Sequence, residues 1–436
     1  MFRELKNFLR ILPEDNVHPE VARHFKHNVY VNTMDMTLFI FGDSFISVNT
    51  ILPVFAATLT DSPLVIGLIP AIINAGWFLP QLFMAGLVEQ LPKKLPFTLK
   101  MAVLERIPYL FFPILALLIP SIGKDNALTL FIALLFLRGF SPGFVALPWQ
   151  EVIATAIPIS HRSRYFGVSR VLGQIMGVLG SALAALIFNR LPYPYSYALA
   201  FSITVIVQWL SFYFFSRNRE PQIKPQEMHP ADEALSKKKL VDFQAYGKIL
   251  KTDKNFRYYL VSRSINFVGF MATGFLAVYA IQQFNLADDQ AAIFTGLFFL
   301  SGIFGNALWG MIGDKVGPKR ILLIATAAWL ASLLFAIIAP NVWVFYLVFL
   351  LFGLANSGSI MGDSILVMEL GTDAQRPSYL GLARSITGIF LLVAPMLAGL
   401  MVKASGYLPM FWLSFICSLL SFGLFLKVKD RPRSSR

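Results

Sequence analysis

The nine residues RSRYFGVSR at positions 162–170 return as RPSYLGLAR at positions 376–384. Both copies read R-x-x-Y-φ-G-x-x-R, where φ is a large apolar residue, and each opens the fifth apolar run in its half of the chain. One pattern at the same place in two halves indicates an internal repeat. The sequence therefore divides into two similar halves.

Long apolar runs surround both copies. The 436 residues are 56% hydrophobic and 14% charged, whereas a soluble protein carries about 25% charged residues. A run of about 20 apolar residues can cross a bilayer as a helix. The runs lie at 36–59, 64–88, 97–120, 127–156, 166–189, 195–216, 256–283, 290–313, 319–339, 342–369, 379–402 and 406–427. We predict an all-α membrane protein with twelve transmembrane helices in two six-helix parallel pseudo-repeats.

The repeat also predicts the organisation of the chain. Two six-span halves with the same orientation are related by an axis along the membrane normal, and substrate is expected at their interface near the midplane. The predicted parts are a cytoplasmic N-terminal segment (1–35), an N-terminal six-helix bundle (36–216), a central cytoplasmic loop (217–255), a C-terminal six-helix bundle (256–427) and a cytoplasmic tail (428–436).

Lysine and arginine predict the orientation. Most of the 37 basic residues fall in the N-terminal segment, the central loop, the tail and the short loops on the same side. Basic residues concentrate in cytoplasmic loops, so both termini are predicted to be cytoplasmic. The expected location is a bacterial plasma (inner) membrane. The net charge of +13 then reflects topology and contact with membrane lipids, and nucleic acid is not an expected partner.

The residues of metal, redox and nucleotide chemistry are sparse. Cys417 is the single cysteine, and the five histidines fall in polar segments between the runs without the spacing of a zinc site. The sequence contains no G-x-x-x-x-G-K-[ST] phosphate-binding loop. We therefore expect no enzyme activity, no cofactor, no metal and no direct use of ATP.

The segment GMIGDKVGPKR at 310–320 carries the most specific motif. It is similar to the G-x-x-x-D-[KR]-x-G-x-[KR]-[RK] turn that follows the second span of a half in the major facilitator superfamily, and the chain resembles that family in layout. The first-half copy departs from the pattern, with Gln90 where the aspartate belongs. The resemblance implies a conformational gate at the cytoplasmic edge, formed by Gly310, Asp314, Lys315, Gly317, Lys319, Arg320, Arg162, Arg170, Arg376 and Arg384.

Charged residues inside spans are expensive and usually functional. Asp43 lies in the first predicted span and Arg138 near the middle of the fourth, in LRGFSPG at 137–143. That stretch resembles the R-x-x-Q-G motif of the family's drug/proton antiporters, with Ser141 where glutamine is usual. We expect Asp43 and Arg138 to pair, with protonation of Asp43 loosening the pair during transport. A permanent ion pair that only fixes helix packing is the alternative.

Further charges lie in the third, seventh and tenth spans. Glu105 and its neighbour Arg106 point about 100° apart on a helix, so we expect them to face different partners. Glu105 and Asp363 are further proton-coupling candidates, Asp363 as a proton or substrate site. Arg263 is expected to extend to the membrane interface.

The resemblance also implies that the first, fourth, seventh and tenth spans line the substrate cavity. Polar and aromatic residues on those spans can contact substrate, although such groups also join helices by hydrogen bonds. The candidates are Asn49, Gln150, Asn266, Tyr279, Gln282 and Asn356.

The function implied is secondary transport by alternating access. We expect a monomer that moves a small organic solute, coupled to protons, with efflux of amphiphilic compounds favoured. The alternatives are an uncoupled carrier or lipid flippase, and a binding or sensing membrane protein built on a transporter fold.

Overall fold

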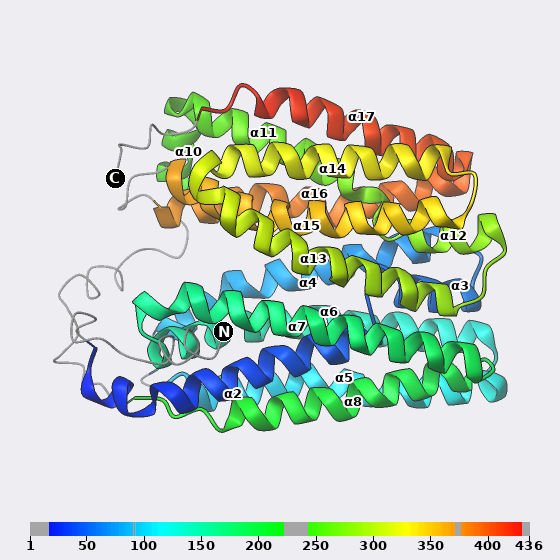
Figure 1. Ribbon diagram of the computed structural model, residues 1–436, viewed down its shortest axis with the longest axis horizontal. Helices are drawn as coiled ribbons and strands as arrows, with labels where there is room; N and C mark the ends of the chain where they lie inside the picture. Colours follow the sequence, from blue (N-terminus) through cyan, green and yellow to red (C-terminus); the bar gives the residue numbers. More distant parts are fainter. Residues whose placement is uncertain (1–16, 90, 92, 222–242, 371–375, 430–436) are drawn as a thin grey trace.

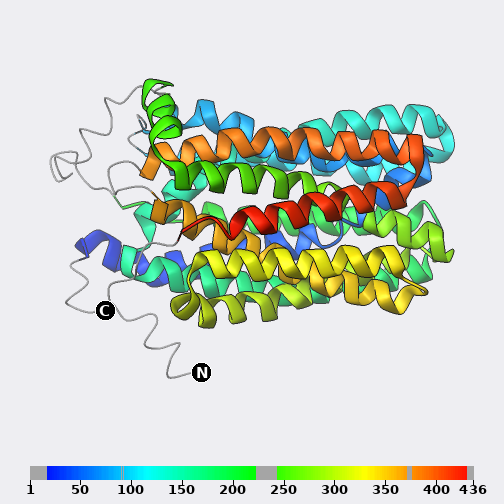
Figure 2. The same ribbon diagram turned by 90° about the horizontal axis from the view of Figure 1, so that it is seen from above.

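The computed structural model describes residues 17–89, 91, 93–221, 243–370 and 376–429, and within them every regular element is helical. Figures 1 and 2 show most of these helices running along the long axis of the molecule.

The two halves form two bundles, the first half below and the second above in Figure 1. The first half contains α2 (Pro19–Asp43), α3 (Ile51–Leu59), α4 (Pro63–Glu89), α5 (Leu95–Ile122), α6 (Lys124–Ala156), α7 (Ile159–Arg190) and α8 (Tyr195–Ser216). The second half contains α10 (Phe243–Thr252), α11 (Lys254–Gly269), η3 (Phe270–Ala272), α12 (Leu276–Phe284), α13 (Asp289–Val316), α14 (Pro318–Ile338), α15 (Val342–Leu370), α16 (Arg376–Ser405) and α17 (Tyr407–Phe425).

Eleven helical segments among the described residues are long and apolar enough to cross a membrane, one of them continuous from α11 to α12. The region predicted as the first span, 36–59, contains the end of α2 and all of α3, separated by a break at residues 44–50. The first helix begins at Pro19 rather than at residue 36. Its early turns contain the polar residues Asn28, Asn32 and Asp35, which are buried inside the bundle. The structure also has a short helix, α10, where the sequence indicated only a loop.

The first span of each half is a helix that breaks partway along its length, between α2 and α3 in one half and between α11 and α12 in the other. In the first half α2 ends at Asp43 and α3 begins at Ile51. Pro53 has no backbone N–H, and a proline ring clashes with the carbonyl four residues earlier, here that of Asn49. A continuous helix through Asn49 is therefore disfavoured.

The carbonyl groups freed at both breaks are bonded by side chains of neighbouring helices. Thr204 of α8 donates to the Gly42 carbonyl at 3.1 Å. In the second half Trp329 of α14 donates to the Gly269 carbonyl at 2.9 Å, and Ser414 of α17 donates to the same oxygen. Because buried carbonyl groups need donors, both breaks are stabilised features of the fold.

The halves meet along two helix pairs, α4 with α16 and α7 with α13. Small residues allow the close approach. A Cβ atom on Gly67 of α4 would lie 2.3 Å from the Pro395 carbonyl oxygen of α16. A Cβ atom on Gly399 of α16 would lie 2.8 Å from the Pro63 carbonyl oxygen of α4. The backbones of the halves therefore touch directly along α4 and α16.

The two ends of the molecule are packed differently. We call them the α3 end (right in Figure 1), where α3 and α12 lie, and the α10 end (left), where α2 begins and α8 ends. At the α3 end a single cluster of buried apolar side chains contains residues of both halves, among them Phe55, Phe131, Phe275 and Phe294. At the α10 end the buried apolar side chains form two separate clusters, one in each half. The apolar core thus joins the halves at the α3 end.

Candidate functional site

Asp43 and Arg138 form an ion pair in the first half. Nη2 of Arg138 lies 2.8 Å from Oδ1 of Asp43. The Arg138 side chain is 5% exposed and the Asp43 side chain 34%. The structure therefore contains the contact expected from the sequence, with the carboxyl group as its more accessible partner.

Four helices surround this pair. Asp43 is the last residue of α2, at the helix break. Arg138 lies on α6, and its guanidinium carbon is 5.4 Å from the ring centre of Tyr109 on α5. A Cβ atom on Gly76 of α4 would lie 2.2 Å from the carbonyl oxygen of Gly139 on α6, so glycine lets these two backbones touch beside Arg138. The guanidinium is fixed by packing, whereas its carboxylate partner sits where the helix is interrupted.

A second ion pair joins the first and fourth spans of the second half. Nε of Arg263 on α11 lies 2.8 Å from Oδ1 of Asp363 on α15. Tyr259 donates its hydroxyl to the same oxygen at 2.6 Å, and Nη1 of Arg263 donates to Oδ1 of Asn266 at 2.7 Å. Two of the sequence candidates, Asp363 and Asn266, thus lie in one cluster.

The expectation that Arg263 extends to the membrane interface is wrong. Its side chain is 4% exposed, and its guanidinium carbon lies 4.2 Å from the ring centre of Phe267. A carboxylate in hydrogen-bonding reach, Asp363, makes burial more favourable than extension to the interface. Sequence reasoning missed this pair because it assigned Arg263 to the membrane interface and treated Asp363 as a separate proton or substrate site.

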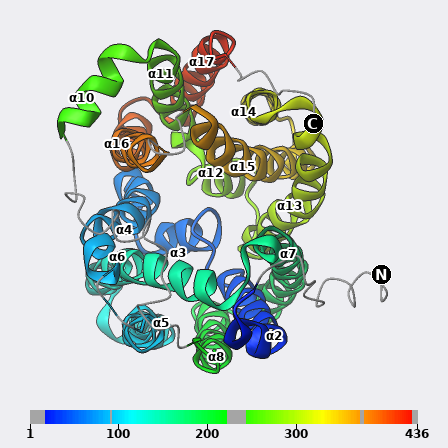
Figure 3. The same ribbon diagram turned by 90° about the vertical axis from the view of Figure 1, so that its left-hand side faces the viewer.

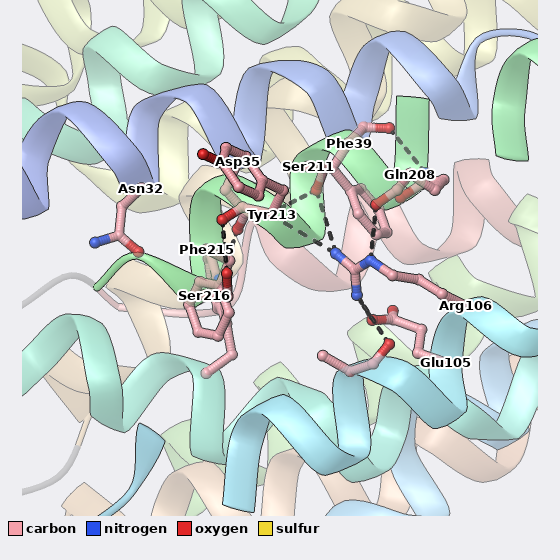
Figure 4. A network of polar contacts seen from close by, with 12 residues as sticks. Asn32, Asp35, Phe39, Glu105, Arg106, Gln208, Ser211, Tyr213, Phe215 and Ser216 are labelled. Carbon is pink, nitrogen blue, oxygen red and sulfur yellow. Dashed lines mark hydrogen bonds and ion pairs between the residues drawn. The ribbon is translucent and has the colours of Figure 1, made fainter. Parts of the chain in front are cut away.

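A third group of charges, more fully buried than Asp43, lies in the first half (Figure 4). Arg106 Nη1 lies 3.1 Å from Oε2 of its neighbour Glu105, and Arg106 Nη2 lies 3.7 Å from Oδ1 of Asp35. Asp35 also accepts hydrogen bonds from Ser211 of α8 at 2.6 Å and Trp149 of α6 at 3.3 Å. The expectation that Glu105 and Arg106 face different partners is wrong, since the long arginine side chain folds back to its neighbour.

Sequence reasoning placed Asp35 in a polar segment before the first span, so it was missed as a site residue. Asn28, Asn32 and Asp35 recur at helical spacing, which is the signal of one buried polar face on a helix. The structure shows all three buried.

The remaining cavity candidates are spread along the molecule. Tyr279 packs among the rings of Phe345, Tyr407 and Phe411 near the α3 end. Gln282 is exposed there and accepts a hydrogen bond from Tyr407 at 2.8 Å. The other three differ in exposure: Asn49 and Asn356 are partly buried and Gln150 is exposed. Tyr279 and Gln282 thus share Tyr407 as a neighbour, and Asn266 lies beside Arg263.

The predicted gate motif is described in part. Gly317 has φ of 85° between α13 and α14, a conformation that favours glycine. Lys319 donates to the Leu426 carbonyl at 3.0 Å, and Arg162 donates to the Ile157 carbonyl at 3.0 Å. Three further members are exposed: Arg320, Arg170 and Arg384. The side chains of Gly310, Asp314, Lys315 and Arg376 lie outside the described part of the structure.

Sequence comparisons point to one family. A family profile described as "Major Facilitator Superfamily" matches residues 34–287 and 259–436. The uncharacterized MFS-type transporter YqjV of Bacillus subtilis (strain 168) is 24% identical over 165 residues, which are 38% of this chain and 40% of that protein. The MFS-type transporter ucsD of Acremonium sp is 22% identical over 306 residues, 70% of this chain and 45% of that protein. The matches thus span less than half the length of either relative.

Solved structures with a similar fold cover nearly the whole chain. A D-xylose-proton symporter aligns with a TM-score of 0.71 at 17% identity, over 95% of this chain and 100% of that one. The human organic anion transporter MFSD10 aligns with a TM-score of 0.63 at 16% identity, over 94% of this chain and 100% of that one. At these identities the likeness concerns the fold.

Proposed function

The chain belongs to the major facilitator superfamily, and on that premise we propose that it is a proton-coupled secondary transporter of a small organic solute, with efflux of amphiphilic compounds as the favoured direction. The family is one of integral membrane transporters rather than enzymes. The observation that carries the proposal is the Asp43–Arg138 pair, whose partly exposed carboxyl group lies at a helix break. Proton coupling of this kind needs a titratable group, such as a carboxyl group, that solution can reach and whose charge controls a contact between helices.

In this mechanism the protein binds a proton at Asp43 and the solute alternately. While Asp43 is ionised it holds α2 against α6 through Arg138. A proton on Asp43 removes the charge from one partner and weakens the pair. The break between α2 and α3 then lets the two parts of the first span move separately. The solutes named for the similar structures, D-xylose and organic anions, support the small organic class.

A transport assay with a panel of candidate solutes tests the proposal. Everted vesicles with an acid interior, read by a quenched dye, are exposed to lipophilic cations, sugars, amino acids, organic anions and lipids. Release of quenching by one class, dependent on the protein, is the expected result. An uncoupled carrier or flippase moves its solute without releasing quenching, and a sensor binds solute without counterflow.

The closed α3 end supports alternating access by rocking of the halves. With the α10 end on the cytoplasmic side, as the basic residues predict, this conformation faces inward. Cross-half contacts hold the α3 end: Thr50 and Thr295 share a hydrogen bond, and Tyr197 donates to Oδ2 of Asp288 at 3.0 Å. In the outward-facing state these contacts are expected to separate.

Gly67→Leu is expected to hold the α3 end apart. A side chain at position 67 meets the Pro395 carbonyl oxygen, and such overpacking costs about 1–3 kcal/mol. That energy shifts a conformational equilibrium by about five- to 150-fold. Spin labels can be attached at Thr60→Cys, just after α3, and at Gln283→Cys, on α12, in a Cys417→Ser background. Pulsed double electron–electron resonance should then report a longer distance between the labels in Gly67→Leu than in the protein with Gly67.

The matched control is Gly423→Leu, since no atom lies within 4 Å of a Cβ atom added at Gly423. It should leave the distance distribution unchanged. An unchanged distribution in Gly67→Leu as well would remove the argument that α4 and α16 limit closure.

Asp288 is expected to make closure of the α3 end depend on pH. It precedes α13, and burial raises the pKa of its carboxyl group above the usual value, with Asp289 adding to the rise and the Tyr197 hydrogen bond opposing it. A carboxyl group with a higher pKa in the closed state binds its proton more tightly there. The closed state is therefore favoured as pH falls through the raised pKa, and loses that preference as pH rises above it.

The same pair of spin labels tests this dependence. The closed population should grow on acidification in the wild type, and Asp288→Asn should flatten that part of the pH curve. Identical curves for the wild type and Asp288→Asn would show that Asp288 does not titrate between the two states.

A further inference from the structure

The charge group of Asp35, Glu105 and Arg106 in the first half contains two carboxyl groups and one guanidinium group. Asp35 and Glu105 both contact Arg106, at 3.7 and 3.1 Å. All three side chains are 7% exposed or less. Arg138 lies nearby on α6, but Asp43 already occupies it at 2.8 Å. Fully ionised, the group would carry one uncompensated negative charge.

Such a charge is expensive inside a membrane bundle. An arginine stays protonated in proteins, so each guanidinium supplies one positive charge. Removing a carboxylate from water costs several kcal/mol unless another group balances it. A carboxyl group in this position binds a proton instead. The group is therefore expected to hold one proton.

The hydrogen bonds favour Glu105 over Asp35 as the carboxyl group that holds the proton. Both oxygens of Asp35 accept hydrogen bonds, Oδ1 from Ser211 and Oδ2 from the indole N–H of Trp149. The indole can only donate, so Oδ2 carries no hydrogen, and a hydrogen on Oδ1 would displace the one that Ser211 donates. Glu105 accepts from Arg106 through Oε2 alone among the described residues, which leaves Oε1 to carry a hydrogen.

We propose that Glu105 is a proton-binding site, neutral in this conformation, and separate from Asp43. It lies on α5 one turn before Tyr109, whose ring faces Arg138. The charged and titratable groups that act on Glu105 and Tyr109 come from α2, α5 and α6: Asp35, Asp43, Arg106 and Arg138. From α8 the uncharged Ser211 and the Gln208 carbonyl complete the shell around Arg106.

The position of Glu105 gives the proton a role, which rests on the proposed function. Glu105 contacts Arg106, and Tyr109, one turn further along α5, contacts Arg138. When Asp43 takes up a proton from solution, Arg138 loses its partner, and ionised Glu105 can replace it as the proton of Glu105 leaves. One proton is then gained and one lost. The Asp43–Arg138 pair opens without a change in the net charge of the buried group.

Infrared spectroscopy of the full-length protein in lipid bilayers tests the site without solute or a pH gradient. A protonated carboxyl group has a carbonyl stretching band that carboxylates lack, and ¹³C in the glutamate side chains shifts the band only if it belongs to glutamate. We expect the band at neutral pH, shifted by labelled glutamate and lost in Glu105→Gln. We also expect its loss in Asp35→Asn, because removal of that carboxylate lets Glu105 ionise beside Arg106.

Glu20→Gln, which changes a half-buried glutamate at the start of α2, should keep the band. Absence of a glutamate band in the labelled wild type would overturn the proposal, even if the variants fail to fold. A band that persists in Glu105→Gln would also overturn it, as would a band shifted by labelled aspartate instead. The proposed transport function can fail while the band is present, so the two tests are separate.

Discussion

Asp43→Asn should abolish solute-driven proton movement while leaving solute exchange in place. Asparagine keeps the shape of the side chain and can still accept a hydrogen bond from Arg138, which lies 2.8 Å from Asp43. It has no proton to gain or lose at physiological pH. In vesicles with an acid interior, the release of quenching should fall to background. Counterflow of radiolabelled solute, which needs no net proton movement, should stay within about tenfold of the wild type.

Asp61→Asn is the matched control, since Asp61 is an exposed aspartate just before α4. It should transport protons and solute as the wild type does. If Asp43→Asn keeps proton movement with an unchanged pH dependence, the Asp43–Arg138 pair only fixes helix packing, and the coupling site lies elsewhere.

Arg106→Met should cause the largest loss of stability. The guanidinium group binds Glu105, Asp35 and the side chain of Ser211, and it also donates to two backbone carbonyls. Removing it leaves the buried Asp35 carboxylate without a cation and Glu105 without its hydrogen-bond donor. Breaking a buried ion pair in this way costs about 3–5 kcal/mol. The midpoint of thermal unfolding in detergent should fall sharply, together with the yield of monodisperse protein.

Two comparisons separate the charge effect from simple truncation. Arg23→Met removes an exposed arginine of α2 whose side chain is 74% exposed, and it should leave the midpoint nearly unchanged. The triple variant Arg106→Met, Asp35→Asn, Glu105→Gln removes all the charges together and should recover much of the loss. If Arg106→Met unfolds with the wild-type midpoint, the buried network does not support the fold.

The fold could be predicted because its main signals are local. Apolar runs longer than a bilayer crossing, together with the repeat at 162–170 and 376–384, predicted the helices and their two-half arrangement. The first helix was the exception, since Asn28, Asn32 and Asp35 made its early turns resemble a surface segment. Their polarity faces the inside of the bundle, and hydropathy alone does not separate a buried polar face from an exposed one.

The candidate site could be predicted only in part. Asp43 and Arg138 each stood out as a charge inside an apolar run, and the resemblance of residues 137–143 to the antiporter motif suggested that the two pair. The partners of Arg263 and Arg106 depended on which helices become neighbours and on how each arginine bends. The sequence lacks that information: Asp363 lies a hundred residues from Arg263, and Glu105 was excluded as a partner of Arg106 by helix geometry that ignores side-chain length.

Uphill transport by the purified protein tests the central claim most directly. The wild type is reconstituted in liposomes with a pH gradient as the sole driving force, and the solute found by the vesicle panel is present at equal concentration on both sides. Secondary transport coupled to protons predicts that the solute accumulates against its own gradient, and that a protonophore or Asp43→Asn abolishes this accumulation. Equal concentrations maintained in the wild type, with the pH gradient intact and counterflow present, would contradict proton coupling and leave an uncoupled carrier.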